Sequence, residues 1–502
     1  MKQSYSLPSE IITIGQKMSK AGYSSFLVGG CVRDILLGKT PKDWDLASDA
    51  TPDQVLEVFE HAHYDNEYGT VRIVNDDTND QKLKVVEITT FRKDIGYSDD
   101  RRPDAIEYST DIADDLARRD FTINALAYPL TSKTPVKDTV LFDESHVVDL
   151  HNGLSDLKDK VIRTVGDPND RFGEDALRLL RAVRFAAQLD FAIESQTLVL
   201  LTANAHRLQN IAVERIADEF NKLIMTDNPG FGLELLRRTN LLQQFIPELL
   251  DGVGVEQNQA HSFTVWEHLI RTLQASADKG FSLEIRLAAL FHDIAKPETR
   301  EISPGSGQPT FYNHEIVGAK ITKTVLKRLK YPKSVVSRVT MFVRWHMFFS
   351  DPDEVTLSAV RRLIANVGAK NIWDLVNLRI CDRIGTGRPK EEPYRLRKFK
   401  AMIEEASRQP TSVKMLAIDG NTLINTLHMK PGKAIGDVLH ILLAKVLEDP
   451  ELNTSDSLLQ ISQDLISRET TKLSNLANQA RAEISDVENA KIKAIRDKYY
   501  VK

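Results

Sequence analysis

Two kinds of hydrophobic periodicity occur in separate regions of this chain. Strand-type alternation, as in GTVRIV and KLKVVEITTF, is confined to residues 1–150, whereas a helical pattern runs almost continuously from residue 151 to the end. In the first region we predict strands at 25–28, 43–48, 69–74, 82–91 and about 136–149, and helices at 8–21, 31–37 and 52–61. This order predicts a mixed α/β head followed by an all-α remainder.

The length and the turn signals predict several domains. At 502 residues the chain is too long for one compact core. The segment 92–110 is charged and has no clear periodicity, so we expect a long loop there. The stretch from about residue 468 is polar and is expected to form a solvated or loosely packed helix. We expect four domains, at residues 1–150, 151–225, 226–390 and 391–502.

Composition and charge restrict the class of protein. The net charge of −5 gives no global sign of nucleic-acid binding, so any RNA-binding charge must be concentrated locally. The chain has no run of about 18 apolar residues and no apolar signal-peptide segment, and we expect no membrane association. Its two cysteines, Cys31 and Cys381, lie far apart in the sequence, which fits a reducing compartment and predicts a cytoplasmic protein.

The segment GGCVRDILLGKTPKDWDL, residues 29–46, combines an anion-binding turn with paired carboxylates. Gly29 and Gly30 separate a short strand from a helix, where a ligand can approach the backbone N–H groups closely, and Arg33 adds a cationic donor. Asp43 and Asp45 alternate along an extended run and should face the same side. Two such carboxylates beside a phosphate are a usual way to hold Mg²⁺, so the segment predicts a nucleoside triphosphate site.

Two further segments carry charged residues at regular spacing. LARRDFTINALAY contains Arg119, Asp120 and Asn124, and we expect an apolar helix after the RRD triplet. Within GDPNDRFGEDALRLLRAVRFAAQLDF, residues 166–191, four charged side chains should lie along one stripe of a single helix. A stripe of this kind is normally a surface salt-bridge ladder, and that alternative stays open. Its members are Asp175, Arg178, Arg181 and Arg184.

In their order, these motifs resemble the class II tRNA nucleotidyltransferase and poly(A) polymerase family, which includes the CCA-adding enzymes. The resemblance extends from about residue 22 to residue 220. It implies that Gly29, Gly30 and Arg33 bind the triphosphate, and that the catalytic residues Asp43 and Asp45 hold Mg²⁺. It further implies a nucleotidyltransferase head at 1–150, a nucleotide-selecting neck at 151–225, a body at 226–390 and a tail at 391–502. The other nucleotide-binding residues implied are Arg119, Asp120, Asn124, Asp175, Arg178, Arg181 and Arg184.

Physical chemistry supports a template-independent selection of CTP and ATP. Cytosine and adenine each present an amine donor beside a ring-nitrogen acceptor, which Asp175 and Arg178 can match by accepting from the amine and donating to the nitrogen. Uracil and guanine present the reverse order and would leave both side chains unpaired, which can cost several orders of magnitude. In the resembled family a loop such as 92–110 is needed to switch from C to A addition. Its full length here favours a complete CCA-adding enzyme.

A second group of residues resembles the HD-domain metal-dependent phosphohydrolases. An adjacent His-Asp pair is combined with histidines and a final aspartate from separate apolar helical segments. Such ligands suit transition metals, including Ni²⁺, Mn²⁺ and Co²⁺, without selecting one of them. We therefore expect a metal site that hydrolyses phosphoesters. Its expected ligands are His268, His292, Asp293, His314, His346 and Asp382.

The sequence thus predicts an enzyme that builds or repairs the 3′-CCA end of tRNA from CTP and ATP, with tRNA as partner. Candidate tRNA contacts lie at 388–400 and 417–436, although a solvated helix face and an ordinary turn explain these segments equally well. Within the family, a poly(A) polymerase or an A-adding enzyme stays open. From other classes, the alternatives are an HD phosphohydrolase whose head only binds RNA, and a non-catalytic tRNA adaptor. The sequence does not determine the oligomeric state.

Overall fold

A computed structural model describes residues 5–66, 69–96, 105–130, 141–257, 262–348, 355–388, 390–408, 412–467 and 469–501. The chain forms two compact units. The first contains Met1–His346 and Cys381–Arg388, and the second contains Met347–Ile380 and Pro389–Lys502. The predicted combination of an α/β head and a helical remainder is confirmed. The exception is two pairs of two-residue strands beyond residue 151, where no strands were predicted. These pairs are β10 (Val161–Ile162) with β11 (Ala192–Ile193) and β12 (Glu301–Ile302) with β13 (Pro309–Thr310).

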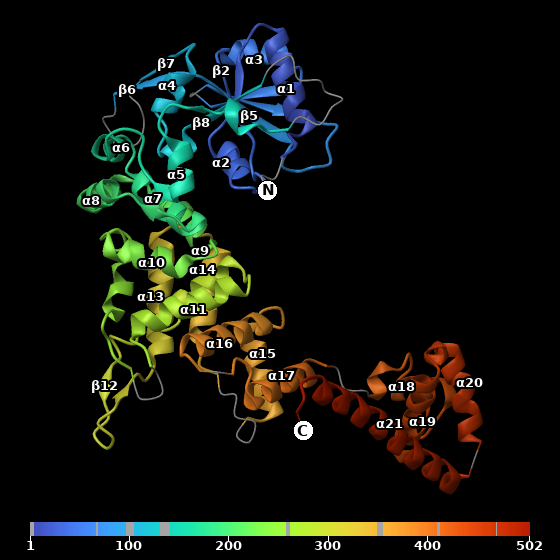
Figure 1. The fold of residues 1–502 in the computed structure, drawn as a ribbon. Helices are drawn as coiled ribbons and strands as arrows, with labels where there is room; N and C mark the ends of the chain where they lie inside the picture. The colour runs from blue at the N-terminus through green and yellow to red at the C-terminus, as the bar shows by residue number, and fades with distance from the viewer. Residues whose placement is uncertain are drawn as a thin grey trace. The chain divides into compact units, whose positions relative to one another are not determined.

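The head is built on a seven-stranded sheet in the order β3-β4-β5-β2-β1-β8-β9 (Figure 1). Antiparallel pairing predominates, but β2 and β5 run parallel. Because β1 and β2 lie inside the sheet, their ends are fixed by neighbours on both sides. The strands are β1 (Ser25–Val28), β2 (Asp45–Ser48), β3 (Ala62–Asn66), β4 (Thr70–Val74), β5 (Val85–Thr90), β8 (Leu126–Leu130) and β9 (Val148–Asp149). The head helices are α1 (Ser9–Lys20), α2 (Gly30–Leu36), α3 (Pro52–Val58) and α4 (Ile112–Ala117).

Several predicted head elements were wrong in type or length. The apolar helix predicted after the RRD triplet is a single 3₁₀ turn, Thr122–Asn124, followed by strand β8. Most of β8 is buried, and a strand buried on both faces has a continuous apolar pattern that periodicity does not distinguish from a helix. The helix predicted at 52–61 ends at Val58, and β3 follows. Of the strand predicted at about 136–149, the described residues contain only β9; residues 131–140 lie outside them.

The segment predicted as a loop at 92–110 is partly a hairpin. β6 (Arg92–Ile95) and β7 (Ala105–Tyr108) pair antiparallel, and residues 97–104 lie outside the described residues. β6 is mostly charged, and the side chains of both strands are exposed or half-buried; Arg92 Nε, for example, lies 3.0 Å from Asp94 Oδ1. The few apolar side chains, among them Ile95 and Tyr108, give only a short and weak alternation, which is not enough to predict a strand.

The neck helices α6 (Pro168–Glu174) and α7 (Leu177–Leu189) correct the prediction that Asp175 lies on the same helix as Arg178, Arg181 and Arg184. Asp175 has an extended backbone conformation with φ −145°, and its Oδ1 accepts a hydrogen bond from the backbone N–H of Leu177 at 3.0 Å. An aspartate that satisfies a free N–H group favours the start of a new helix, which explains the break. The other neck helices are α5 (Gly153–Asp159), α8 (Ser195–Ala203) and α9 (Val213–Ile224).

Beyond the neck, helices form most of the first unit and all the regular structure described in the second unit. None of the described helices combines the length and the apolar character needed to cross a membrane. The body helices are α10 (Pro229–Arg238), α11 (Val265–Asp278), α12 (Leu283–Phe291), α13 (His314–Arg328) and α14 (Lys333–Trp345). They are followed by α15 (Leu357–Val367), α16 (Ile372–Gly385), α17 (Tyr394–Ser407), α18 (Gly420–Leu427), α19 (Lys433–Glu448), α20 (Ser455–Ile466) and α21 (Thr470–Lys498).

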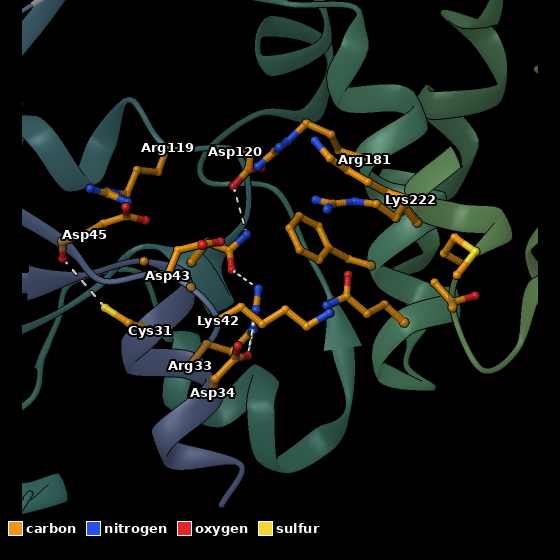
Figure 2. A pocket seen from close by; sticks show the side chains of 18 residues that line it. Cys31, Arg33, Asp34, Lys42, Asp43, Asp45, Arg119, Asp120, Arg181 and Lys222 are labelled. Atoms are coloured by element: carbon orange, nitrogen blue, oxygen red, sulfur yellow. Dashed lines mark hydrogen bonds and ion pairs between the residues drawn. The ribbon is translucent and has the colours of Figure 1, made fainter. Parts of the chain in front are cut away.

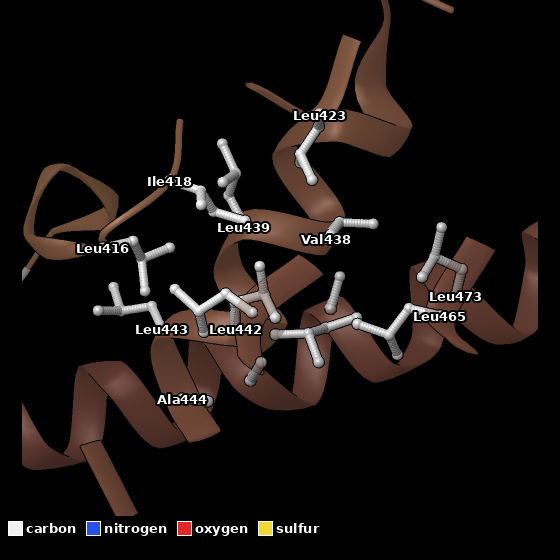
Figure 3. Close-up of a cluster of buried hydrophobic side chains, with 14 residues drawn as sticks. Leu416, Ile418, Leu423, Val438, Leu439, Leu442, Leu443, Ala444, Leu465 and Leu473 are labelled. Carbon is white, nitrogen blue, oxygen red and sulfur yellow. The ribbon is translucent and has the colours of Figure 1, made fainter. Parts of the chain in front are cut away.

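The second unit has its own hydrophobic core, centred on α19 (Figure 3). Leu442 is fully buried there, and Leu473, Ala477 and Ala480 from α21 join the same cluster. The first turns of α21 are therefore packed, which corrects the prediction of a solvated or loosely packed terminal helix. The rest of α21 is polar, so the sequence pattern did not indicate that these few apolar residues are buried.

Replacing Leu442 by Ala should destabilise this unit by about 2–5 kcal/mol, because it removes a buried side chain and leaves a cavity. Hydrogen exchange followed by mass spectrometry should then show faster exchange in peptides from α18 to α21. Ile466→Ala is a matched control, because Ile466 is 36% exposed and its truncation should cost less than about 1 kcal/mol. Equal exchange rates in the two variants would contradict the assignment of Leu442 to the core.

Candidate active site and metal centre

A cavity of about 510 Å³ lies between the head sheet and the neck helices α7 and α9 (Figure 2). Both sets of elements contribute polar side chains, so the cavity is strongly charged. From the head it is lined by Gly29, Gly30, Cys31, Arg33, Asp34, Lys42, Asp43, Asp45, Arg119, Asp120 and Asn124. From α7, α9 and the turn after α9 it is lined by Arg181, Arg184, Phe185, Gln188, Lys222, Met225 and Thr226.

The Gly29–Gly30 turn joins β1 to α2 in the predicted way. Gly29 has φ +74°, and a Cβ atom there would lie 2.7 Å from Arg119 Nη1, so a larger residue would be strained in its backbone and would displace this guanidinium. Arg33, one turn into α2, is 5% exposed. It donates from Nη1 to Asn124 Oδ1 at 2.7 Å and from Nη2 to Asp34 Oδ1 at 2.7 Å. These bonds fix its guanidinium beside the turn.

The two predicted metal-binding carboxylates, Asp43 and Asp45, both line this cavity. Asp45 begins β2, whereas Asp43 precedes the strand, which is two residues shorter than predicted. The protein packed around Asp45 raises its pKa to about 6; Glu87 and Asp43 add to this effect and Arg119 opposes it. A carboxylate crowded by other carboxylates is stabilised by a bound cation. The pair therefore fits a divalent metal, with the anion-binding turn at the same cavity.

Asp120 links the head to the neck. Its Oδ1 accepts from Asn124 Nδ2 at 3.2 Å, and its Oδ2 accepts from Arg181 Nε at 2.8 Å and Nη2 at 2.6 Å. Burial alone would raise the pKa of Asp120, but Arg181 and Arg178 lower it to about 2. Because Asn124 also accepts from Arg33, one chain of hydrogen bonds runs from the Gly29–Gly30 turn to α7.

Three arginines surround the ring of Phe185. The guanidinium carbons of Arg33, Arg181 and Arg184 lie 5.2, 5.3 and 4.0 Å from the ring centroid. Behind them Glu219 Oε2 lies 3.0 Å from Arg184 Nε. Burial, together with the neighbouring Arg181 and Arg33, lowers the pKa of Arg184 to about 10. This cationic cluster is suited to a polyanion.

The sequence did not single out several of these residues. Phe185 appeared as an ordinary apolar residue, and Glu219 appeared as one of several charges in the helical segment VERIADEF. Lys222, Gln188 and Met225 gave no signal at all. Their role depends on α7 and α9 packing together, which no local pattern encodes.

Asp175 and Arg178 do not line this cavity, whereas Arg181 and Arg184 do. Asp175 Oδ2 is paired with Arg215 Nη2 at 2.8 Å, and Arg178 Nη1 is paired with Glu174 Oε2 at 2.5 Å. The side chains of Asp175 and Arg178 are 18% and 11% exposed, so they form half-buried ion pairs rather than an exposed ladder along α7. These pairs instead connect α9 and α6 to the helix break.

In the body, all six predicted metal ligands converge on one buried centre. They form two groups that could each hold a metal ion, namely His268, His292 and Asp382, and Asp293, His314 and His346. Asp293 faces both. Its Oδ2 lies 3.2 Å from His268 Nε2 and 3.1 Å from His292 Nε2, and its Oδ1 lies 3.2 Å from His314 Nε2 and 3.5 Å from His346 Nε2.

Helix ends orient most of these histidines. His292 follows α12, His314 begins α13 and His346 follows α14. In each, Nδ1 lies 2.6–2.9 Å from the backbone carbonyl three residues earlier, which leaves Nε2 facing the centre. The facing Nε2 atoms of His268 and His292 are 3.0 Å apart. Four inward imidazole nitrogens around a carboxylate are the donors that divalent transition metals prefer.

Comparisons with known proteins agree with this arrangement. The family models described as "Poly A polymerase head domain", "Probable RNA and SrmB- binding site of polymerase A" and "HD domain" match residues 25–163, 190–252 and 260–383. A protein named CCA-adding enzyme from Limosilactobacillus reuteri is 32% identical over 462 residues, which cover 90% of this chain and 95% of that protein. A second, from Pediococcus pentosaceus, is 44% identical over 237 residues, 47% of this chain and 55% of its own length.

The fold is also found among solved structures. The crystal structure of the Bacillus stearothermophilus CCA-adding enzyme in complex with CTP covers 91% of this chain, and the match covers 98% of that enzyme, with a TM-score of 0.58 and 24% identity. This likeness supports the fold, and the Limosilactobacillus relative, similar along nearly its whole length, supports the family. The chain belongs to the CCA-adding enzyme family.

Proposed function

We propose that this protein builds or repairs the 3′-terminal CCA of tRNA, using CTP and ATP with Mg²⁺ and releasing pyrophosphate. The observation that carries the proposal is the convergence of Asp43 and Asp45 with the Gly29–Gly30 turn and Arg33 in one cavity. Relatives named CCA-adding enzyme, which align with this chain over nearly their whole length, support the same activity.

Each part of the cavity has a distinct task in this reaction. Asp43 and Asp45 would hold Mg²⁺, which would help to activate the tRNA 3′-hydroxyl and to polarise the α-phosphate. The Gly29–Gly30 backbone and Arg33 bind the β- and γ-phosphates and stabilise the pyrophosphate that leaves. Asn124 and Asp120 keep Arg33 and Arg181 in place, so these donors need little rearrangement when the nucleotide binds.

The activity is tested with tRNA transcripts that end at the discriminator base. CTP alone should give two added nucleotides, and CTP with ATP should give CCA. Asp43→Asn should lower the rate by several orders of magnitude because it weakens metal binding. Asp53→Asn is the matched control, since Asp53 is exposed on α3 and outside the cavity.

Other outcomes would select another function. Addition of A residues from ATP alone would favour the poly(A) polymerase or A-adding alternative. Absence of pyrophosphate release with every tRNA and nucleotide would favour a head that only binds RNA. A normal rate in Asp43→Asn with excess Mg²⁺ would contradict the assigned active site.

We further propose that Asp175 and Arg178 select the base. Both lie at the break between α6 and α7, and Arg178 Nη2 donates to the carbonyl of Arg118, two residues before Asp120, at 3.0 Å. In this structure their charges are satisfied by Arg215 and Glu174. Reading a base therefore requires the pair to exchange these partners for the amine and ring nitrogen of cytosine or adenine.

Asp175→Ala and Arg178→Ala should raise the incorporation of UTP and GTP relative to CTP and ATP in a four-nucleotide competition. Arg237→Ala serves as the control, because it breaks a comparable helical ion pair with Glu234 in α10, away from the cavity. Removing one partner of a purely structural pair would lower stability and leave nucleotide choice unchanged. That result would contradict the base-selecting role.

We also propose that the body centre is a metal-dependent phosphohydrolase that takes Ni²⁺, Mn²⁺ or Co²⁺. The observation that favours it is Asp293, whose two oxygens face two separate histidine groups. A bound transition metal lowers the pKa of water enough for attack on phosphorus near neutral pH. Suitable substrates are 2′,3′-cyclic phosphates and 3′-phosphates at RNA ends, because their removal would leave an end that the head can extend.

His292→Ala should abolish hydrolysis of a cyclic-phosphate substrate and leave nucleotide addition unchanged. It should also lower the amount of bound transition metal per chain, measured by atomic emission, which reports on the site independently of activity. His206→Ala, an exposed histidine, is the control. Wild-type protein that binds no metal and hydrolyses none of these phosphates would contradict the proposal.

The remaining assignments follow from the same function. We assign the nucleotidyltransferase head to residues 1–150, the neck to 151–225, the body to 226–390 and a tRNA-binding tail to 391–502. Segments 388–400 and 417–436 are the proposed tail contacts, and the full 92–110 segment is proposed to switch C addition to A addition. Cys31 and Cys381 are both buried and neither forms a disulfide, which supports a cytoplasmic location.

A further inference from the structure

The turn after α9 joins the neck to the body and also forms one end of the cavity wall. Met225 and Thr226 in this turn line the cavity, together with Lys222 from the end of α9. Met225 is 44% exposed, whereas Thr226 is buried. The groups that hold this turn therefore determine the shape of the cavity at the end formed by the neck.

Arg286, a buried side chain of α12, holds this turn from the body. It is 4% exposed, and its Nη1 donates to the carbonyls of Ile224 at 2.9 Å and Thr226 at 2.8 Å. Its Nε donates to the carbonyl of Phe281 at 3.0 Å. Within the described part of the chain, its hydrogen-bond acceptors are all backbone carbonyls. The rigid guanidinium thus connects the end of α9 to the segment before α12.

Gln274, on the neighbouring helix α11, holds the next part of the same turn. Its Nε2 donates to the carbonyl of Asp227 at 2.7 Å, and its Oε1 accepts from the backbone N–H of Gly230 at 3.2 Å. Two body side chains therefore fix the backbone from Ile224 to Gly230. Neither of them lines the cavity, so any effect on catalysis must act through the turn.

We propose that Arg286, assisted by Gln274, is a positioning residue for nucleotidyl transfer, and this inference rests on the proposed function. The body thereby completes the nucleotide site as a structural support, independently of its metal centre. The effect should fall on nucleotide binding. The reacting groups, Asp43, Asp45 and the Gly29–Gly30 turn, all belong to the head and keep their own contacts when the turn shifts.

The test compares kcat and KM for CTP in the addition of C to saturating tRNA. The variants are Arg286→Ala, Arg286→Lys and Gln274→Ala, assayed where circular dichroism shows each to be folded. Arg286→Ala should raise KM by about tenfold, since small displacements of a binding wall are costly, and change kcat by less than about twofold. Gln274→Ala should raise KM less, and Arg286→Lys should restore part of the loss.

Arg328→Ala is the matched control, because Arg328 pairs with Glu248 and donates to the carbonyl of Phe245 elsewhere in the body. It should lower Tm without changing KM. Folded Arg286→Ala and Gln274→Ala proteins with wild-type KM would overturn the inference, as would an equal rise of KM in Arg328→Ala. If Arg286→Ala does not fold, Gln274→Ala and Arg286→Lys decide. Wild-type protein that adds no nucleotide would instead overturn the proposed function.

Discussion

The shape of the cavity depends on the carboxylate of Asp120. One of its oxygens accepts from Asn124, which in turn accepts from Arg33, and the other accepts from Arg181 in the neck. Head and neck are therefore held together by charge-assisted hydrogen bonds along the cavity. Burial raises the pKa of Asp120, but the neighbouring Arg181 and Arg178 lower it further, which favours the charged carboxylate in this setting. Removing it would leave Arg181 without its nearest carboxylate partner, which is more costly than exchanging the whole network for apolar groups.

The same network explains how three arginines can share one aromatic ring. Guanidinium groups this close repel each other unless anions stand behind them, and here Asp34, Asp120 and Glu219 occupy that position. These carboxylates hold the arginines, so the guanidinium groups that line the cavity are oriented before any ligand arrives. Fixed donors of this kind bind a polyanion with little reorganisation. The crowded carboxylates Asp43 and Asp45 supply the opposite charge in the same space.

Structural features formed by residues that are adjacent in sequence could be predicted, whereas features that depend on packing between distant residues could not. The β1–Gly29–Gly30–α2 turn was found because its glycines, strand and helix are adjacent in sequence. The break at Asp175 was missed because periodicity continues through it, and strand β8 was missed because a strand buried on both faces has no alternation. The pairing of Asp175 with Arg215 joins residues 40 positions apart, and only the packing of the neck helices creates it. No spacing rule could have supplied that partner.

The body centre shows why a set of ligands spread over more than one hundred residues could still be found. At His292, His314 and His346 the ring is oriented by a carbonyl three residues earlier, so most of the geometry is local. Asp382 differs because it lies within α16, so its position depends on how closely α16 packs against α11. A Cβ atom at Gly385 would overlap Thr272 on α11 and lie 3.2 Å from His268 Nδ1. Only glycine lets α16 approach α11 this closely, and that approach brings Asp382 Oδ1 to 3.3 Å from His268 Nε2. The last ligand is therefore placed by a residue that carries no side chain.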